Sequence, residues 1–320
     1  MTTYNKPFLT FEEQVNLLEK RGVIISDRAE ALSFLSKVSY YKFGGYTLFF
    51  EAKGTSSQRS SIYPHNTEFK EIIALYEFDR ELRNLMWEAL SKIEIAVKTN
   101  ITHILTSVKS ASQGAFVLYD TSLFSNKDKQ DVILDKIWKA VFKNKAEKYI
   151  DHYCKKYCEK SCINRTAQKS NNDPKDCSEK IPLWMASEVM TFGNISVLFK
   201  YLNTDTRNDI SKPLGIDGYY YTSWLHTCSV VRNICAHHGR LFNRNNMVFP
   251  KKLDKPWHVV KSNTFFAILC CVKEMMRFHK IDSAEWKQKI ENLIKTANFR
   301  DKNISMGLFD GWEQTALWKR

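Results

Sequence analysis

The longest uninterrupted helical pattern in the chain runs from about Thr67 to Leu105, and it limits the fold more than any other feature. Apolar side chains recur there at spacings of three and four residues, as on one face of an α-helix, and neither Pro nor Gly interrupts them. They are Leu75, Phe78, Leu82, Leu85, Ala89, Ile93, Val97, Ile101 and Ile104. A pattern longer than ~25 residues is typical of the central helix of a bundle. We therefore expect a helical bundle built around this segment.

Further helical patterns lie on both sides of this segment. Helix starts are indicated at Thr10 with Glu13 (a capping box), at Asp27 with Glu30, near Pro182, near Gly218 and at about Asn263, where a helix should run to His279. Alternating stretches are short, and no Asn-Gly or Asp-Gly turn is bracketed by strand patterns. The expected fold class is all-α, a helical bundle with additional N-terminal and C-terminal helices.

The chain is expected to divide into three parts. Residues 1–65 form an N-terminal helical and aromatic module, residues 66–300 a helical core, and residues 301–320 a tail that packs on the core. Within the core, residues 143–180 are rich in Lys, Asn and Ser and poor in Leu and Val, which is typical of an insertion.

The charge balance indicates an anionic partner. The 320 residues include 48 Lys and Arg against 35 Asp and Glu, a formal net charge of +13. An excess of this size is typical of proteins that bind nucleic acid or an acidic membrane surface. The longest apolar run, Phe265 to Val272, is well short of the ~20 residues that a spanning helix needs. The N-terminus lacks the pattern of a signal peptide. We expect a cytoplasmic protein without a membrane partner.

Three cysteines raise the question of a metal site. Cys154, Cys158 and Cys162 repeat every four residues, with His152 nearby. On a helix this spacing places three thiols along one face, so a zinc protein is one hypothesis. Paired C-x-x-C spacing and a second cluster are missing. We favour an amphipathic helix that uses cysteine as a small apolar residue, and we predict no metal and no cofactor.

One segment of thirteen residues, RNICAHHGRLFNR, concentrates the side chains that could do chemistry. It contains Arg232, Asn233, His237, His238, Arg240, Asn243 and Arg244. Asn233 and His237 are four residues apart and would share a helix face. Arg232 is five residues from His237, about 140° round an ideal helix, so one helix holds this pair loosely. Two copies that meet at a two-fold axis would combine their Arg and His side chains into one site.

These residue types suit the cleavage of RNA without a metal. Histidine titrates near neutrality and can take the proton of a ribose 2′-hydroxyl. Arginine offers a planar fork of donors to phosphate oxygens, and Asn233 can orient either group. We take Arg232, Asn233 and His237 as the candidate catalytic residues, with His238 as a supporting residue or alternative base. The structural alternative is that Arg232 forms an ion pair or caps carbonyls and that both histidines are surface residues.

The motif and four other segments resemble one protein family. R-N-x-x-x-H is the R-x4–6-H signature of the HEPN superfamily, and the longer string resembles abortive-infection proteins of the AbiD/AbiF type. The other similar segments are YYKFGGYTLFF (Tyr40–Phe50), FDRELRNLMWEALSKIEIAVK (Phe78–Lys98), IPLWMASEVMTFGNIS (Ile181–Ser196) and MGLFDGWEQTALWK (Met306–Lys319). They occur in family order over nearly the whole chain. Lys98 stands where an Arg is common, and residues 143–180 carry no family motif.

The resemblance implies a HEPN-type helical bundle whose dimerisation brings two R-x4-H motifs together. It also implies a metal-independent endoribonuclease, acting as the toxin of an anti-phage or toxin–antitoxin system. RNA would be the substrate, and a small non-coding RNA would be an antitoxin partner. The alternative is a protein of the same defence setting that binds a structured small RNA or a partner protein without cleaving it.

The charge downstream of the motif agrees with an RNA partner. Residues 232–302 contain 15 Lys and Arg against 6 Asp and Glu, with aromatic side chains between them, a combination that suits single-stranded RNA. The candidate RNA-binding residues are Arg240, Asn243, Arg244, Lys251 and Lys252. Asp79, Arg80 and Arg83 could support the site, but ion pairing that fixes one helix against another is the interpretation we favour for them.

Overall fold

The computed structural model describes residues 7–52, 61–64, 66–108, 114–144, 146–157, 180–253 and 256–319. The α-helices in these ranges are α1 (Phe11–Lys20), α2 (Arg28–Lys37), α3 (Tyr40–Thr47), α4 (Phe69–Val108), α5 (Lys127–Lys143), α6 (Lys148–Tyr157), α8 (Leu183–Val189), α9 (Phe192–Tyr201), α10 (Thr204–Ser211), α11 (Gly218–Ala236), α12 (Phe265–Phe278), α13 (Ala284–Thr296), α14 (Lys302–Met306) and α15 (Ala316–Lys319). Over the same ranges, β-type pairing is confined to two isolated bridges, Ile24 with Glu68 and Phe124 with Leu202. The all-α prediction is confirmed.

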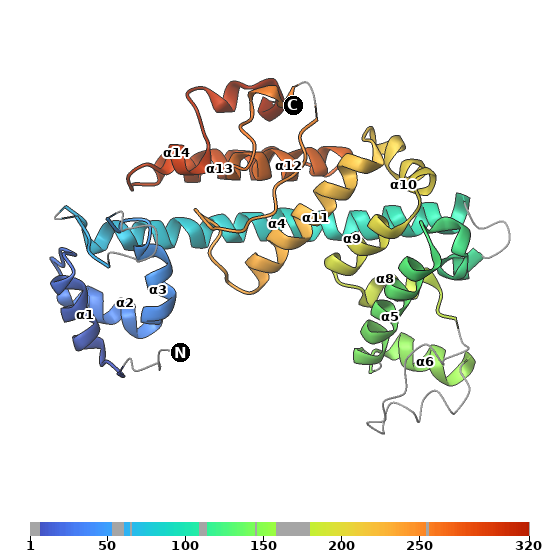
Figure 1. Cartoon of the computed structure of the whole chain (residues 1–320), viewed down its shortest axis with the longest axis horizontal. Coiled ribbons are helices and arrows are strands. Elements are labelled where there is room, and N and C mark those ends of the chain that lie inside the picture. The colour runs from blue at the N-terminus through green and yellow to red at the C-terminus, as the bar shows by residue number, and fades with distance from the viewer. Residues whose placement is uncertain are drawn as a thin grey trace. The chain divides into compact units, whose positions relative to one another are not determined.

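The expected long helix is α4, drawn in cyan in Figure 1. It has 40 residues, about 60 Å at 1.5 Å per residue. Most of its predicted apolar series is buried, and Leu85 and Ile104 are half-buried. The helix begins two residues after Thr67 and ends three residues beyond Leu105, so the pattern located both ends closely.

The predicted N-terminal helix starts are also confirmed. Thr10 caps α1, its hydroxyl accepting from the Glu13 amide while the Glu13 carboxylate accepts from the Thr10 amide. Asp27 caps α2 by accepting from the Glu30 amide at 2.9 Å. Caps of this kind satisfy amides that have no partner within the helix.

The chain forms two compact units, and the boundary between them falls inside α4 and inside α11. The first unit comprises residues 1–86, 234–246 and 284–313; the second comprises residues 87–233, 247–283 and 314–320. The sequence-based division into an N-terminal module, a core and a tail stays a prediction.

The first unit is held together by aromatic side chains from segments far apart in the sequence. Phe49, Phe78, Phe242 and Phe299 meet edge to face, with ring centroids 5.1–6.3 Å apart. This geometry is favourable because the ring edge is positive and the face negative. The Arg300 guanidinium also pairs with the Glu71 carboxylate of α4 at 2.7 Å. Phe242, which lies just after the motif, is therefore packed into the core of this unit.

The second unit is built around α12, in which every residue except Arg277 is buried. Trp224 of α11 packs against Trp257 and Phe278, with ring centroids 5.0 and 5.8 Å apart. Helix α5 of the same unit packs against α8 and α9. Among the helices in the described ranges, none combines the length and the apolar character that crossing a membrane requires.

Candidate functional site

The motif lies on α11 and on the turn that follows it. One side of this helix is buried and carries mostly apolar and aromatic side chains: Tyr221, Trp224, Leu225, Cys228 and Val231. The helix ends at Ala236. His237 is thus the first residue beyond it, and the helical face on which Asn233 and His237 were expected together stops one residue short of the histidine.

Arg232 is half-buried in the second unit. Its Nε donates to Oε2 of Glu94 on α4 at 2.9 Å, and its guanidinium lies 4.9 Å from the ring centre of Trp87. Lys98 contacts the other oxygen of Glu94 at 3.3 Å. The ion pair is what the structural alternative for Arg232 predicts. The terminal nitrogens of Arg232 donate no hydrogen bond within the described part of the chain, and 26% of its side chain is exposed. The anchored arginine can still offer these donors to an anion.

The turn after α11 is a Schellman motif, which lies in the first unit. The Gly239 amide donates to the Ile234 carbonyl at 2.8 Å, and the His238 amide donates to the Cys235 carbonyl at 3.0 Å. This pattern satisfies the last carbonyls of a helix and needs a left-handed residue, usually glycine. His238 occupies that position with φ of 52°. A Cβ on Gly239 would lie 3.1 Å from Ile234 Cγ2, so glycine fits best at the next position.

The turn leaves the polar side chains of the motif accessible. Asn233, His237 and His238 are all exposed. Asn233 and Arg232 belong to the second unit, whereas His237 and His238 belong to the first. The structure thus places each candidate catalytic residue on or directly after one helix, with the arginine anchored and the histidines open to solvent.

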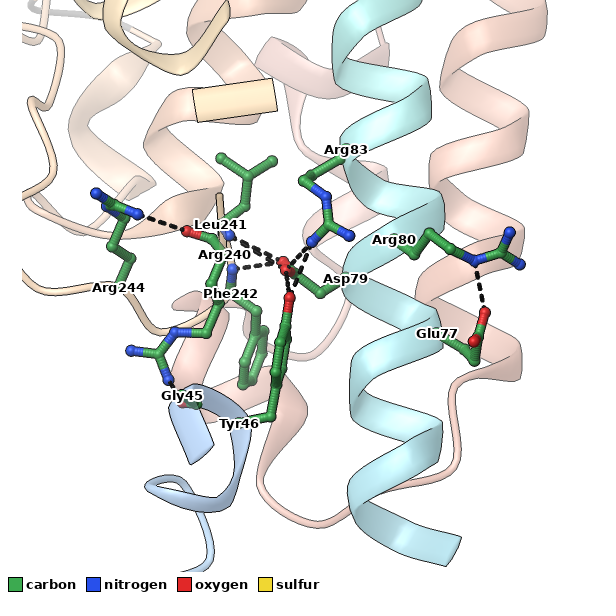
Figure 2. Close-up of polar contacts among 10 residues, drawn as sticks. All are labelled: Gly45, Tyr46, Glu77, Asp79, Arg80, Arg83, Arg240, Leu241, Phe242 and Arg244. Carbon is green, nitrogen blue, oxygen red and sulfur yellow. Dashed lines mark hydrogen bonds and ion pairs between the residues drawn. The ribbon is translucent and has the colours of Figure 1, made fainter. Parts of the chain in front are cut away.

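A buried carboxylate holds the segment that follows the histidines (Figure 2). Asp79 of α4 is fully buried and accepts from the Phe242 amide at 2.7 Å, from the Leu241 amide at 3.1 Å and from the Tyr46 hydroxyl at 2.8 Å. Arg83, one turn along α4, pairs with the same carboxylate. The network joins α3, α4 and residues 241–242 within one unit, so it fixes the chain directly after the motif.

The charge of Asp79 is set by opposing effects. Burial raises the pKa of the Asp79 carboxyl, while the Arg83 guanidinium and the amide of Phe242 lower it in part. Hydrogen bonds to a buried carboxylate are necessary because an isolated buried charge is costly. Asp79 and Arg83 do form an ion pair, but both residues lie on α4, so this pair does not fix one helix against another as predicted. Arg80 is exposed and pairs with Glu77 and Glu81 on its own helix, so it joins no other element in these contacts.

The five candidate RNA-binding residues are divided between the two units, and they differ in how accessible they are. Arg240 is half-buried and donates to the Gly45 carbonyl (Figure 2), whereas Asn243 and Arg244 are exposed. These three belong to the first unit. In the second unit Lys251 is exposed, but the ammonium of Lys252 donates to the Val260 carbonyl at 2.7 Å. Arg244 and Lys251 are therefore the more accessible cations.

The cysteine hypothesis stays a prediction. Cys154 lies in α6, but its side chain is outside the described part of the structure, as are residues Cys158 and Cys162. Within the described ranges, no group of three or more His, Cys, Asp and Glu side chains could hold a metal ion. Four other cysteines, Cys228, Cys235, Cys270 and Cys271, are buried free thiols.

Sequence reasoning misses two residues of the site, Glu94 and Tyr46. Glu94 is four residues before Lys98 on α4, a spacing that predicts a local pair, but its contact with Arg232 spans 138 residues. Tyr46 is one ring of an aromatic segment, and nothing near it in the sequence indicates a carboxylate partner. One signal could have indicated these contacts. Asp79 follows Phe78 on the buried face of α4, and a charged residue on a buried face needs a polar partner elsewhere in the fold.

A family model described as Abi-like protein matches residues 33–243, which include α4, α11 and the motif. No curated protein and no solved structure matches the chain.

Proposed function

The chain belongs to the family of Abi-like proteins, which indicates a role in abortive infection, and on that premise we propose that it is a metal-independent endoribonuclease of the HEPN type. Its activity against RNA would make it the toxin of an anti-phage or toxin–antitoxin system. The observation that carries the proposal is the arrangement of Arg232. Its Nε is anchored by Glu94, and its terminal nitrogens lack hydrogen-bond partners in the described chain.

The proposed reaction uses the 2′-oxygen of the substrate as the nucleophile. His237 takes the proton from the 2′-hydroxyl, and that oxygen forms a bond to the adjacent phosphorus. The bond from phosphorus to the 5′-oxygen of the next nucleotide breaks, and a histidine of the second motif returns a proton to this oxygen. Arg232 neutralises the charge that builds on the phosphate. The products are a 2′,3′-cyclic phosphate and a 5′-hydroxyl.

A homodimer would complete the site, because two motifs that meet at a two-fold axis would combine their Arg and His side chains. Each protomer supplies an anchored Arg232 and an exposed His237. We expect sedimentation at micromolar concentration to give the mass of a dimer. A monomer that cleaves RNA as efficiently would contradict the composite site.

The test of the activity is the cleavage of labelled RNA in the presence of EDTA, with mapping of both ends. His237→Ala should abolish cleavage and leave the fold intact, because His237 is exposed. His103→Ala, at an exposed histidine on α4, is the matched control. Arg232→Lys keeps a donor for Glu94 but loses the fork, and it should lower the rate on the order of 100-fold.

Three results would reject the mechanism. They are cleavage that EDTA abolishes, cleavage at a 2′-deoxy position, and full activity of folded His237→Ala. RNA binding without cleavage by the wild type would favour the alternative function, a protein that holds a structured small RNA.

A further inference from the structure

One face of α11 stays accessible and mostly polar within the second unit. Its side chains recur at spacings of four and three residues, so they lie on one side of the helix: Tyr219, Ser223, His226, Val230 and Asn233. The first, third and last are exposed, and Ser223 and Val230 are half-buried. We call this set the α11 accessible face. It extends for about 21 Å at 1.5 Å per residue, and it ends at the residue after Arg232.

An aromatic ring and a cation stand together at the start of this face. Tyr219 is 57% exposed, and the ammonium of Lys251 lies 3.6 Å from its ring centre and donates to its hydroxyl. The backbone of Lys251 is fixed on α11, because its amide donates to Ser223 Oγ at 2.9 Å and its carbonyl accepts from Trp224 Nε1 at 2.8 Å. The cation is therefore held in place by the fold.

A second cation at the same end of α11 lacks a counter-ion among the described residues. The terminal nitrogens of Arg207 donate to the hydroxyls of Thr222 and Thr204 at 3.4 and 3.2 Å. Its Nε is buried without a hydrogen-bond partner. Neutral hydroxyls accept hydrogen bonds but carry no negative charge, so the positive charge of Arg207 stays available to an anion.

We propose that the α11 accessible face binds single-stranded RNA, with a base stacked on Tyr219 and the phosphates held by Lys251 and Arg207. An exposed ring beside a fixed cation, here Tyr219 and Lys251, is the chemistry that recognises unpaired bases and their backbone. In a duplex the bases are already paired and stacked, so a single strand should be preferred. The proposal rests on the proposed function, since it extends the substrate contacts from Arg232 and Asn233 along the helix.

The test is the binding of a fluorescein-labelled single-stranded oligouridylate, followed by anisotropy at low salt in the His237→Ala protein. Tyr219→Ala should weaken binding about tenfold, because one stacked base is lost. Tyr219→Phe keeps the ring and should bind like the parent protein. Tyr41→Ala is the matched control, because Tyr41 is 95% exposed and lies in the other unit. Lys251→Gln should reduce the dependence of the affinity on salt.

Binding and cleavage separate this proposal from the proposed function. Tyr219-dependent binding by a wild-type protein that does not cleave RNA would support the α11 accessible face and reject the nuclease. Equal affinities of Tyr219→Ala and Tyr41→Ala would overturn the role of the ring even if cleavage is found. If Tyr219→Phe does not bind the oligonucleotide, the proposal that a base stacks on the ring of residue Tyr219 is wrong. Absence of RNA binding would overturn the proposal as a whole and leave this face to a protein partner.

Discussion

Among single residues, His238 has an unusual backbone position directly after the R-x4-H motif. It takes the left-handed position that ends α11, with φ of 52°. A side chain in this conformation brings Cβ close to the following carbonyl, which glycine avoids. His238 is thus held in its exposed position at a conformational cost, one residue after the candidate base.

We expect His238→Gly to raise the free energy of unfolding by up to about 1 kcal/mol, because glycine is the preferred residue at this position. His237→Gly should instead lower it by about 0.5–1 kcal/mol, since the main effect there is added freedom of the unfolded chain. Thermal unfolding of both variants tests this. If His238→Gly were less stable than the wild type, the inference that the backbone of His238 is strained would be wrong. Loss of cleavage with a retained fold in this variant would show that His238 takes part in the reaction.

Three polar residues in and around α4 show how burial decides the effect of a substitution. Asp79→Asn leaves Arg83 buried without its anion and should cost about 3–5 kcal/mol. Tyr46→Phe removes one hydrogen bond to Asp79 and should cost about 1–2 kcal/mol. Arg80→Gln removes exposed pairs and should cost about 1 kcal/mol or less. Urea unfolding measures all three. Equal costs for Tyr46→Phe and Arg80→Gln would show that the buried hydrogen bond from Tyr46 to Asp79 contributes no more than the exposed ion pairs.

Among the elements, the contact between α11 and the end of α12 predicts a pH dependence. His279, which follows α12, is half-buried, and its Nε2 lies 2.8 Å from the Tyr221 hydroxyl of α11. Burial lowers the pKa of His279 from 6.5 to about 4. Between these two values the unfolded chain binds a proton that the folded chain does not.

Stability should therefore fall as the pH decreases from about 6.5 to about 4, by on the order of 3 kcal/mol. His279→Gln, which can still bond Tyr221, should remove this part of the dependence. His258→Gln, at an exposed histidine, should keep it. Chemical denaturation at several pH values is the measurement. If the free energy of unfolding depends on pH in the same way in the wild type and in His279→Gln, another group causes the dependence.

For the molecule as a whole, the net charge of +13 should make RNA binding sensitive to salt, because cations displace counterions from phosphates. Arg244→Gln should reduce the slope of log affinity against log salt by about 0.7 for each lost phosphate contact. Arg240→Gln should act on folding instead, since Arg240 holds the Gly45 carbonyl. An affinity that does not change with salt would indicate a protein partner.

The long helix and several helix starts can be predicted from the sequence alone. The pattern of α4 and the caps of α1 and α2 depend on residues within a few positions of one another, and such local interactions can be recognised in a single sequence. The same holds for the location of the motif, whose residues are neighbours in the chain. The end of α11 is the exception, because His238 occupies a position where a glycine is the usual signal.

The partners of these residues depend instead on the tertiary structure. Glu94 reaches Arg232 across 138 positions, and Asp79 reaches Phe242 across 163. The fold also engages Arg240 and Lys252 with backbone carbonyls while Arg244 and Lys251 remain accessible. Local patterns carry no information on such contacts, because they depend on which buried faces pack together. A charge on an apolar face indicates that it needs a partner, and packing alone selects which one.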